Sequence, residues 1–156
     1  MVNVQVNVYY RIGSQLNNGA SMEELTKEEI CIFVEKSITD RQYNDELLFL
    51  LPSKTIQRVK ETLYFDLNSY QGVISSHSVR HVKKRHPDDL LYICEILEII
   101  QKFSKVQKSI TKDQKTGATL VSLEFYKKYD NETVKLVKLK VHREKRLELK
   151  TIFIKD

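Results

Sequence analysis

The sequence lacks several features that would place it in a specialised class. It has no run of 18 or more apolar residues, so we expect neither a membrane-spanning helix nor a membrane partner. Its N-terminus lacks the charged and then apolar layout of a signal peptide, which favours a cytoplasmic protein. No internal repeat and no low-complexity linker is visible. These absences leave a globular cytoplasmic chain as the expectation.

Cysteine is also scarce, with only Cys31 and Cys94 among 156 residues. No CxxC pair is present, so we expect no structural zinc site, and nothing else in the sequence indicates a metal or cofactor. Each cysteine lies within an apolar helical pattern. In a reducing cytoplasm we therefore predict buried free thiols rather than a disulfide.

What is present is the composition of one folded domain. Hydrophobic residues make up 41% of the chain and charged residues 30%, as in globular proteins. Lysine and arginine number 26 against 21 acidic residues, a net charge of +5. This small excess is a weak indication of a polyanionic partner such as nucleic acid.

Periodicity predicts mixed elements in the first third of the chain. Residues 2–10 alternate between apolar and polar side chains, which indicates a half-buried strand. Thr26 and Glu29 form a capping box that would open a helix. The inward stripe of that helix would be Ile30, Phe33, Val34 and Ile38. Residues 47–51 are apolar but too few to assign.

The rest of the chain turns from helices to strands. Ser53 can cap a helix over residues 54–63, and residues 90–103 predict a largely apolar central helix. From about residue 105 the period becomes two, with short turns between strands and a phase slip near Leu136 that suggests a bulge. The last strand would place these side chains on one face: Leu147, Leu149, Thr151 and Phe153. We therefore predict an α+β fold, an N-terminal strand and helices followed by a four-stranded antiparallel β-meander packed on helices.

Residues 70–89 contain the candidate site. Val79 and Val82 suit the inward stripe of a short helix that Ser75 or Ser76 can cap and Pro87 should end. The other positions are rich in imidazole and cationic groups. Those on one predicted face are His77, His81, Lys84 and Arg85. Such a face is suited to phosphate chemistry, whereas the plainer alternative is a solvated basic helix.

A family pattern accounts for these residues. Residues 63–70 match a G-L-D-L-x-x-Y turn without its glycine. Four residues match the following I-x-S-x-x-x-x-H-I-x-K-R-H-G pattern, in which Pro87 replaces the glycine: His81, Lys84, Arg85 and His86. On these residues the chain resembles the third phage-associated subgroup of the barnase, EndoU, colicin and RelE-like nucleases. The resemblance implies such a nuclease domain over residues 51–156 and leaves residues 1–50 as an extension that packs on the core or binds a partner.

The resemblance implies a metal-independent ribonuclease of phage or mobile-element origin. One imidazole would remove the ribose 2′-hydroxyl proton, an acid would protonate the leaving oxygen, and cations would stabilise the phosphate, giving a 2′,3′-cyclic phosphate. His81 is the principal catalytic candidate, because it matches the family pattern. Further catalytic candidates are His77, His86, Lys150 and Thr151, and the substrate-binding candidates are Lys54, Lys84, Arg85 and His142.

Several alternatives stay open. His77 and His142 are equally well explained as surface histidines, and His86 as a hydrogen-bonded structural histidine. The whole protein could instead be an inactive RNA-binding or host-protein-binding effector on the same fold. Expected partners are RNA, with transfer RNA one candidate, an immunity or host protein, and a second copy paired through the N-terminal strand.

Overall fold

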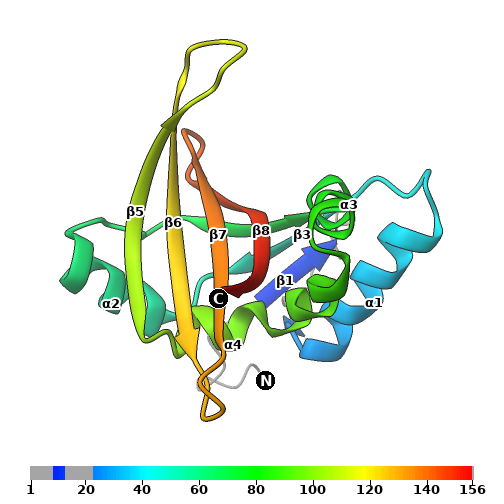
Figure 1. Ribbon diagram of the computed structural model, residues 1–156, viewed down its shortest axis with the longest axis horizontal. Helices are drawn as coiled ribbons and strands as arrows, with labels where there is room; N and C mark the ends of the chain where they lie inside the picture. Colours follow the sequence, from blue (N-terminus) through cyan, green and yellow to red (C-terminus); the bar gives the residue numbers. More distant parts are fainter. Residues whose placement is uncertain (1–8, 13–22, 156) are drawn as a thin grey trace.

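The computed structural model describes residues 9–12 and 23–155 as one mixed sheet with its helices gathered on one face (Figure 1). The strands are β1 Tyr9–Ile12, β2 Glu23–Glu24, β3 Glu46–Leu50, β4 Gln71–Ser75, β5 Lys105–Lys112, β6 Thr119–Lys128, β7 Val134–His142 and β8 Arg146–Lys155. The helices are α1 Lys27–Thr39, α2 Ser53–Leu63, α3 Ser76–Arg85 and α4 Ile96–Gln101, with a 3₁₀ helix η1 at Pro87–Glu95. None of these helices is long and apolar enough to cross a membrane.

The predicted α+β class and its four-stranded meander are confirmed. Strands β5 to β8 pair antiparallel in chain order, and the full sheet runs β2-β1-β3-β4-β8-β7-β6-β5. Strand β4 joins β8 in parallel and connects the meander to β3 and β1. No periodic signal predicted β4, because a short strand that is buried on both faces shows no alternation. Most of the predicted N-terminal strand, residues 2–8, lies outside the described residues.

The helix predictions hold at α1 and α3 and need correction at α2 and over residues 90–103. The capping box of Thr26 and Glu29 is present, and the helix buries Ile30, Phe33 and Val34. Helix α2 begins at Ser53 itself, after Pro52, and no side chain caps it. The predicted single helix over residues 90–103 is a 3₁₀ helix followed by the short α4. An apolar stripe reports burial but does not distinguish 3.0 from 3.6 residues per turn over so few turns.

The predicted bulge position was wrong. Leu136 does not mark a slip in β7, since it lies on the outer face of the sheet opposite Phe153. The register shifts further along, where Leu139 pairs with Leu149 but Lys138 pairs with Thr151, so Lys150 is the extra residue of β8. Ile152 therefore takes the core side that the alternation had given to Thr151.

The two cysteines are also a correction, because Cys31 and Cys94 form a disulfide with a Cα–Cα distance of 5.2 Å. Helix α1 packs against η1, which brings together two residues 63 positions apart. Cys94 is buried, as the apolar pattern predicted. The residues around each cysteine do not predict this contact, because it depends on how α1 packs against η1.

The disulfide should contribute substantially to stability. For a loop of 63 residues the chain-entropy model gives about 4 kcal/mol. Urea unfolding with and without dithiothreitol should show a loss of this order on reduction. The Cys31→Ala/Cys94→Ala variant should respond to no reductant, and titratable free thiols in the oxidised wild-type protein would contradict the bond.

Gly72 should tolerate no side chain, because a Cβ added there would overlap the ring of Phe49. We expect Gly72→Ala to lower the free energy of unfolding by about 1–3 kcal/mol, the usual cost of overpacking. Combining it with Phe49→Leu should cost less than the sum of the two single changes, measured by urea unfolding. Strict additivity would show that this contact is not the cause.

Candidate active site along helix α3 and strand β8

Helix α3 forms as the sequence predicted and presents its basic face to solvent. The Ser75 side chain accepts a hydrogen bond from the Ser78 N–H at 3.0 Å, which caps the N-terminus. The helix ends at Arg85, two residues before Pro87. Val79 and Val82 are fully buried, and Ser76 and Ser78 are buried beside them. The exposed positions of the helix are His77, His81, Lys83, Lys84 and Arg85.

Arg80 fixes α3 against α1 rather than serving the basic face. Its guanidinium donates to the backbone oxygens of Ser37 at 3.0 Å and Asp40 at 3.1 Å, and also to that of Tyr43. Ser37 Oγ donates to Ser76 Oγ at 3.1 Å. The Arg80 guanidinium thus satisfies free backbone carbonyls at and just after the end of α1. These hydrogen bonds fix the orientation of α3 relative to α1.

Strand β8 follows α3 along its length, and three successive neighbours mark the contact. At the start of the helix, Ser75 and Ser78 reach Glu148. In the middle, the charge of Lys150 acts on His81. At the end, the ring of His86 stacks on Phe153, with 4.6 Å between ring centroids and an interplanar angle of 17°. The alternative in which His86 is a structural histidine held by hydrogen bonds is therefore replaced by one in which its ring is held by stacking.

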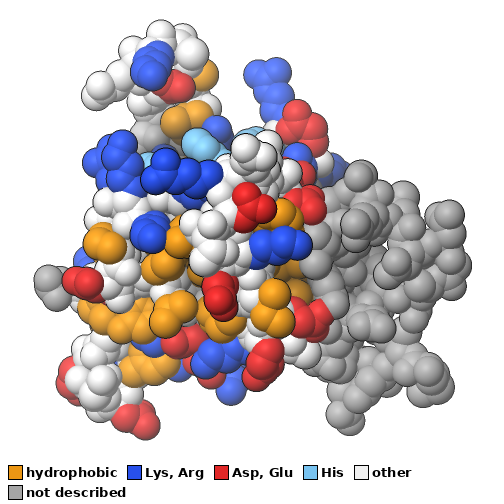
Figure 2. Space-filling model, turned by 90° about the vertical axis from the view of Figure 1, so that its right-hand side faces the viewer, with side chains coloured by type: hydrophobic (Ala, Val, Ile, Leu, Met, Phe, Trp, Pro, Cys, Tyr) orange, Lys and Arg blue, Asp and Glu red, His pale blue; other side chains and the backbone are white. Residues whose placement is uncertain are grey.

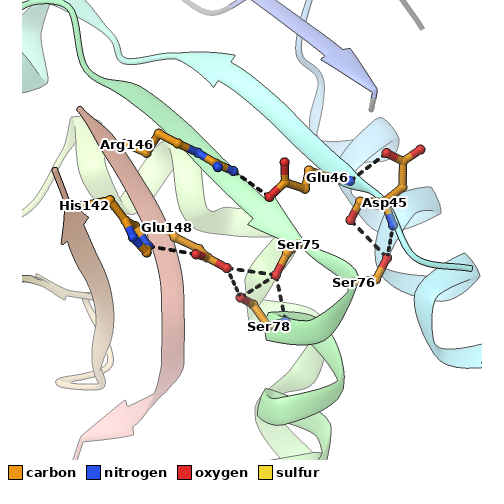
Figure 3. Close-up of polar contacts among 8 residues, drawn as sticks. All are labelled: Asp45, Glu46, Ser75, Ser76, Ser78, His142, Arg146 and Glu148. Carbon is orange, nitrogen blue, oxygen red and sulfur yellow. Dashed lines mark hydrogen bonds and ion pairs between the residues drawn. The ribbon is translucent and has the colours of Figure 1, made fainter. Parts of the chain in front are cut away.

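Glu148 is the centre of a polar network that sequence reasoning missed (Figure 3). Its Oε1 lies 2.9 Å from Nε2 of His142, and its Oε2 accepts from Ser75 Oγ at 3.1 Å and Ser78 Oγ at 3.3 Å. Alternation in the last strand predicts that Glu148 faces away from the core. It carries no sign that β7 and the start of α3 converge on it.

The electrostatic surroundings of His81 differ from those of the Glu148 network. Burial first, and then the positive charges of Arg85, the two other helix histidines and Lys150, hold the pKa of His81 below its usual 6.5. Burial also lowers the pKa of Lys150, as do the charges of Lys138 and Lys140. The cluster therefore favours a neutral imidazole at His81 and offers several cations to an anion.

Two side chains beside Lys150 complete the outer face of the sheet. Lys138 forms an ion pair of 3.4 Å with Glu124, so part of its charge is already balanced. Thr151, which pairs with Lys138, has a buried Oγ1 without a hydrogen-bond partner among the described residues. No group of three or more His, Cys, Asp or Glu side chains that could hold a metal ion is present in the described part of the chain.

The other predicted site residues divide by position. His77, Lys84 and Arg85 are exposed on α3 together with His81. Figure 2, which views the molecule from the α3 side, shows histidine side chains beside a group of lysine and arginine side chains on the upper part of this face. Lys54 is not in this cluster, because it lies in the first turn of α2, at the other end of the molecule (Figure 1).

The two departures from the family pattern are structurally accommodated. Tyr64 stands at the missing glycine and has φ 56° and ψ 32°, the left-handed conformation that favours glycine. Asp66 and Leu67 of the same turn are structural, since Asp66 Oδ1 accepts from Asn68 N–H and Leu67 is fully buried. Pro87 occupies the first turn of η1, where its missing N–H is not needed.

The proximity of Lys150 to His81 can be tested by titration. In Lys150→Gln the pKa of His81 should rise, because one positive neighbour is removed, yet stay below 6.5 because burial is the largest cause of its depression. NMR titration of the His81 ring protons measures this. Lys112→Gln, an equivalent change at an exposed site in β5, should leave the pKa unchanged. An equal response to both changes would contradict the geometry.

One of three comparisons with known proteins identifies a family for this chain. The family model described as phage-Barnase-EndoU-ColicinE5/D-RelE like nuclease3 matches residues 52–156, about two thirds of the chain. No curated protein matches, and no solved structure does. The matched region contains β4, α3, β7 and β8, and hence every residue of the Glu148 network. The chain therefore belongs to the third family of phage-associated nucleases of the barnase, EndoU, colicin E5/D and RelE-like type.

Proposed function

We propose that this nuclease cleaves RNA without a metal ion, by attack of the ribose 2′-hydroxyl on the adjacent phosphate. One observation supports it above the others: the imidazole of His81 is exposed on α3 beside Lys84 and Arg85. Partial burial, and then the neighbouring positive charges, lower its pKa. A neutral imidazole at neutral pH can accept a proton, and the same cations attract the phosphate that the reaction needs.

In the proposed reaction His81 removes the proton from the 2′-hydroxyl. The resulting oxyanion attacks phosphorus, and the bond from phosphorus to the 5′-oxygen breaks. Arg85 and Lys150 would stabilise the charge that develops on the phosphate oxygens, with Lys84 and His77 as further phosphate contacts. The products are a 2′,3′-cyclic phosphate and a 5′-hydroxyl end. DNA lacks the attacking hydroxyl and would not be cleaved.

Purified protein incubated with RNA in EDTA should produce fragments that end in a 2′,3′-cyclic phosphate. His81→Ala should lower the rate by about 10²- to 10⁴-fold, the usual contribution of one proton-transfer group. Gel analysis with end-group assignment measures both. A DNA strand of the same sequence should stay intact.

Lys83→Ala is the matched control, since Lys83 is exposed on the same helix but does not belong to the face of His81. It should keep most of the activity. Full activity of His81→Ala would remove His81 from the mechanism. If the wild-type protein binds RNA in a salt-dependent way but does not cleave it, the catalytically inactive RNA-binding alternative replaces the proposal.

A further inference from the structure

We propose that Glu148 is a positioning residue that holds His142 as the proton donor for the leaving 5′-oxygen. The inference rests on the proposed ribonuclease function and assigns its missing acid. His142 ends β7, and Glu148 lies beside it near the start of β8. Each side chain is about a quarter exposed, so solvent and substrate can reach the pair while the strands restrict its movement.

The hydrogen bonds of Glu148 define its charge and direction. Ser75 Oγ accepts a hydrogen bond from the Ser78 N–H. The hydroxyl proton of Ser75 is therefore available for donation to Glu148 Oε2, at 3.1 Å. Ser78 Oγ can donate either to Ser75 Oγ at 2.8 Å or to Glu148 at 3.3 Å. One carboxylate oxygen is thus occupied by hydroxyl donors from a helix cap, and the other faces the imidazole. An ionised carboxylate satisfies all of these partners, because it only accepts hydrogen bonds.

This arrangement selects one form of the His142 ring. An ionised Glu148 requires a proton on Nε2, at 2.9 Å from Oε1. Nδ1 is then the nitrogen that can give or take a proton. When both ring nitrogens carry protons, the contact becomes an ion pair, so the carboxylate stabilises the donor form of His142.

Two cations lie across the β7–β8 pair from these residues. Lys140 is opposite Glu148, and the described residues show no ion pair between the two side chains. Arg146 is opposite His142 across the β7–β8 pair, but its guanidinium binds Glu46 at 2.5 Å (Figure 3). It therefore does not compete for Glu148. The ring of His142 is also the one histidine ring that a side chain orients by hydrogen bonding in the described structure.

The position of His142 relative to Lys150 suits protonation of the leaving 5′-oxygen. Glu148 and Lys150 are two residues apart on β8, about 7 Å along a strand. Glu148 contacts His142, and Lys150 acts on His81, so the two imidazoles lie on either side of this short segment. A phosphodiester bound at Lys150 would have His81 near its 2′-hydroxyl and His142 near its 5′-oxygen.

The proposed step is balanced. As the phosphorus–oxygen bond to the 5′-oxygen breaks, the electron pair goes to that oxygen, which takes the proton from Nδ1 of His142. The proton that His81 removed from the 2′-hydroxyl stays on His81. His142 is left neutral and regains a proton from water. One imidazole lies among cations and the other is hydrogen-bonded to a carboxylate, a contrast that matches the opposite roles of base and acid.

A double-mutant cycle on kcat tests the relay. Glu148→Gln keeps an acceptor for His142 but removes the charge, and His142→Gln keeps an N–H donor for Glu148. We expect His142→Gln to lower kcat by about 100-fold or more, the range of one proton-transfer group, and Glu148→Gln by about tenfold or more. The double variant should be no slower than His142→Gln alone, since Glu148 acts only through His142. KM should change little in either variant.

Glu95→Gln is the matched control, because Glu95 is a partly buried carboxylate that binds Lys135 of β7 and has no histidine partner among the described residues. It should keep the wild-type kcat. A separate readout is the ¹⁵N spectrum of the His142 ring in the inactive His81→Ala protein, which should show the proton on Nε2.

The following results would contradict the proposal. If Glu148→Gln lowers kcat by the same factor in the His142→Gln background, Glu148 acts independently and the relay is overturned. If Glu148→Gln leaves kcat unchanged, or if the ring carries its proton mainly on Nδ1, the positioning role is overturned while the ribonuclease function stands. If wild-type protein cleaves no RNA but the ring shows the Nε2 proton, the proposed function fails and the acid role fails with it.

Discussion

The contact of α3 with β8 is the constraint on which the candidate site depends. Val79 and Val82 are buried on one side of the helix. His77 and His81 therefore lie on the opposite, exposed side. Glu148 holds the start of the helix and Phe153 its end. The exposed face of α3 is therefore held at both ends alongside β8, and cations and imidazoles meet between those ends.

The site is electrostatically divided along β8. Near Lys150 the charges are positive and disfavour protonation of His81. Two residues earlier on the strand, a carboxylate faces His142. A base and an acid need such opposite surroundings to work at one pH. The bulge at Lys150 contributes to this arrangement, because the extra residue sits between Glu148 and Thr151 on the outer face.

Residues before the family match also support the site. Helix α1 lies outside residues 52–156, yet its C-terminal carbonyls bind Arg80 and its Ser37 contacts the first residue of α3. The disulfide joins the same helix to η1. Strand β3 pairs with β4, from which α3 directly continues. The orientation of the basic face is thus tied to a part of the chain that carries none of the family's matching residues.

Local patterns in the sequence determined several elements of the fold and one face of the site. The cap at Ser75, the stop at Pro87 and the valine spacing define α3, because capping, backbone restriction and 3.6-residue periodicity act within one or two turns. The capping box of α1 and the meander of β5 to β8 followed from the same kind of local signal. These local features are sufficient to place His81 and its neighbours on one face of one helix.

Only the tertiary structure decided which residues from other elements join that face. The pairing of Glu148 with His142 depends on the register of β7 with β8, which alternation alone did not predict, and the position of the bulge further along β8 was also wrong. The approach of Lys150 to His81 and the bond between Cys31 and Cys94 join residues more than sixty positions apart. Such contacts leave no periodic trace, since they depend on the packing of whole elements and on which edge of β8 the helix covers.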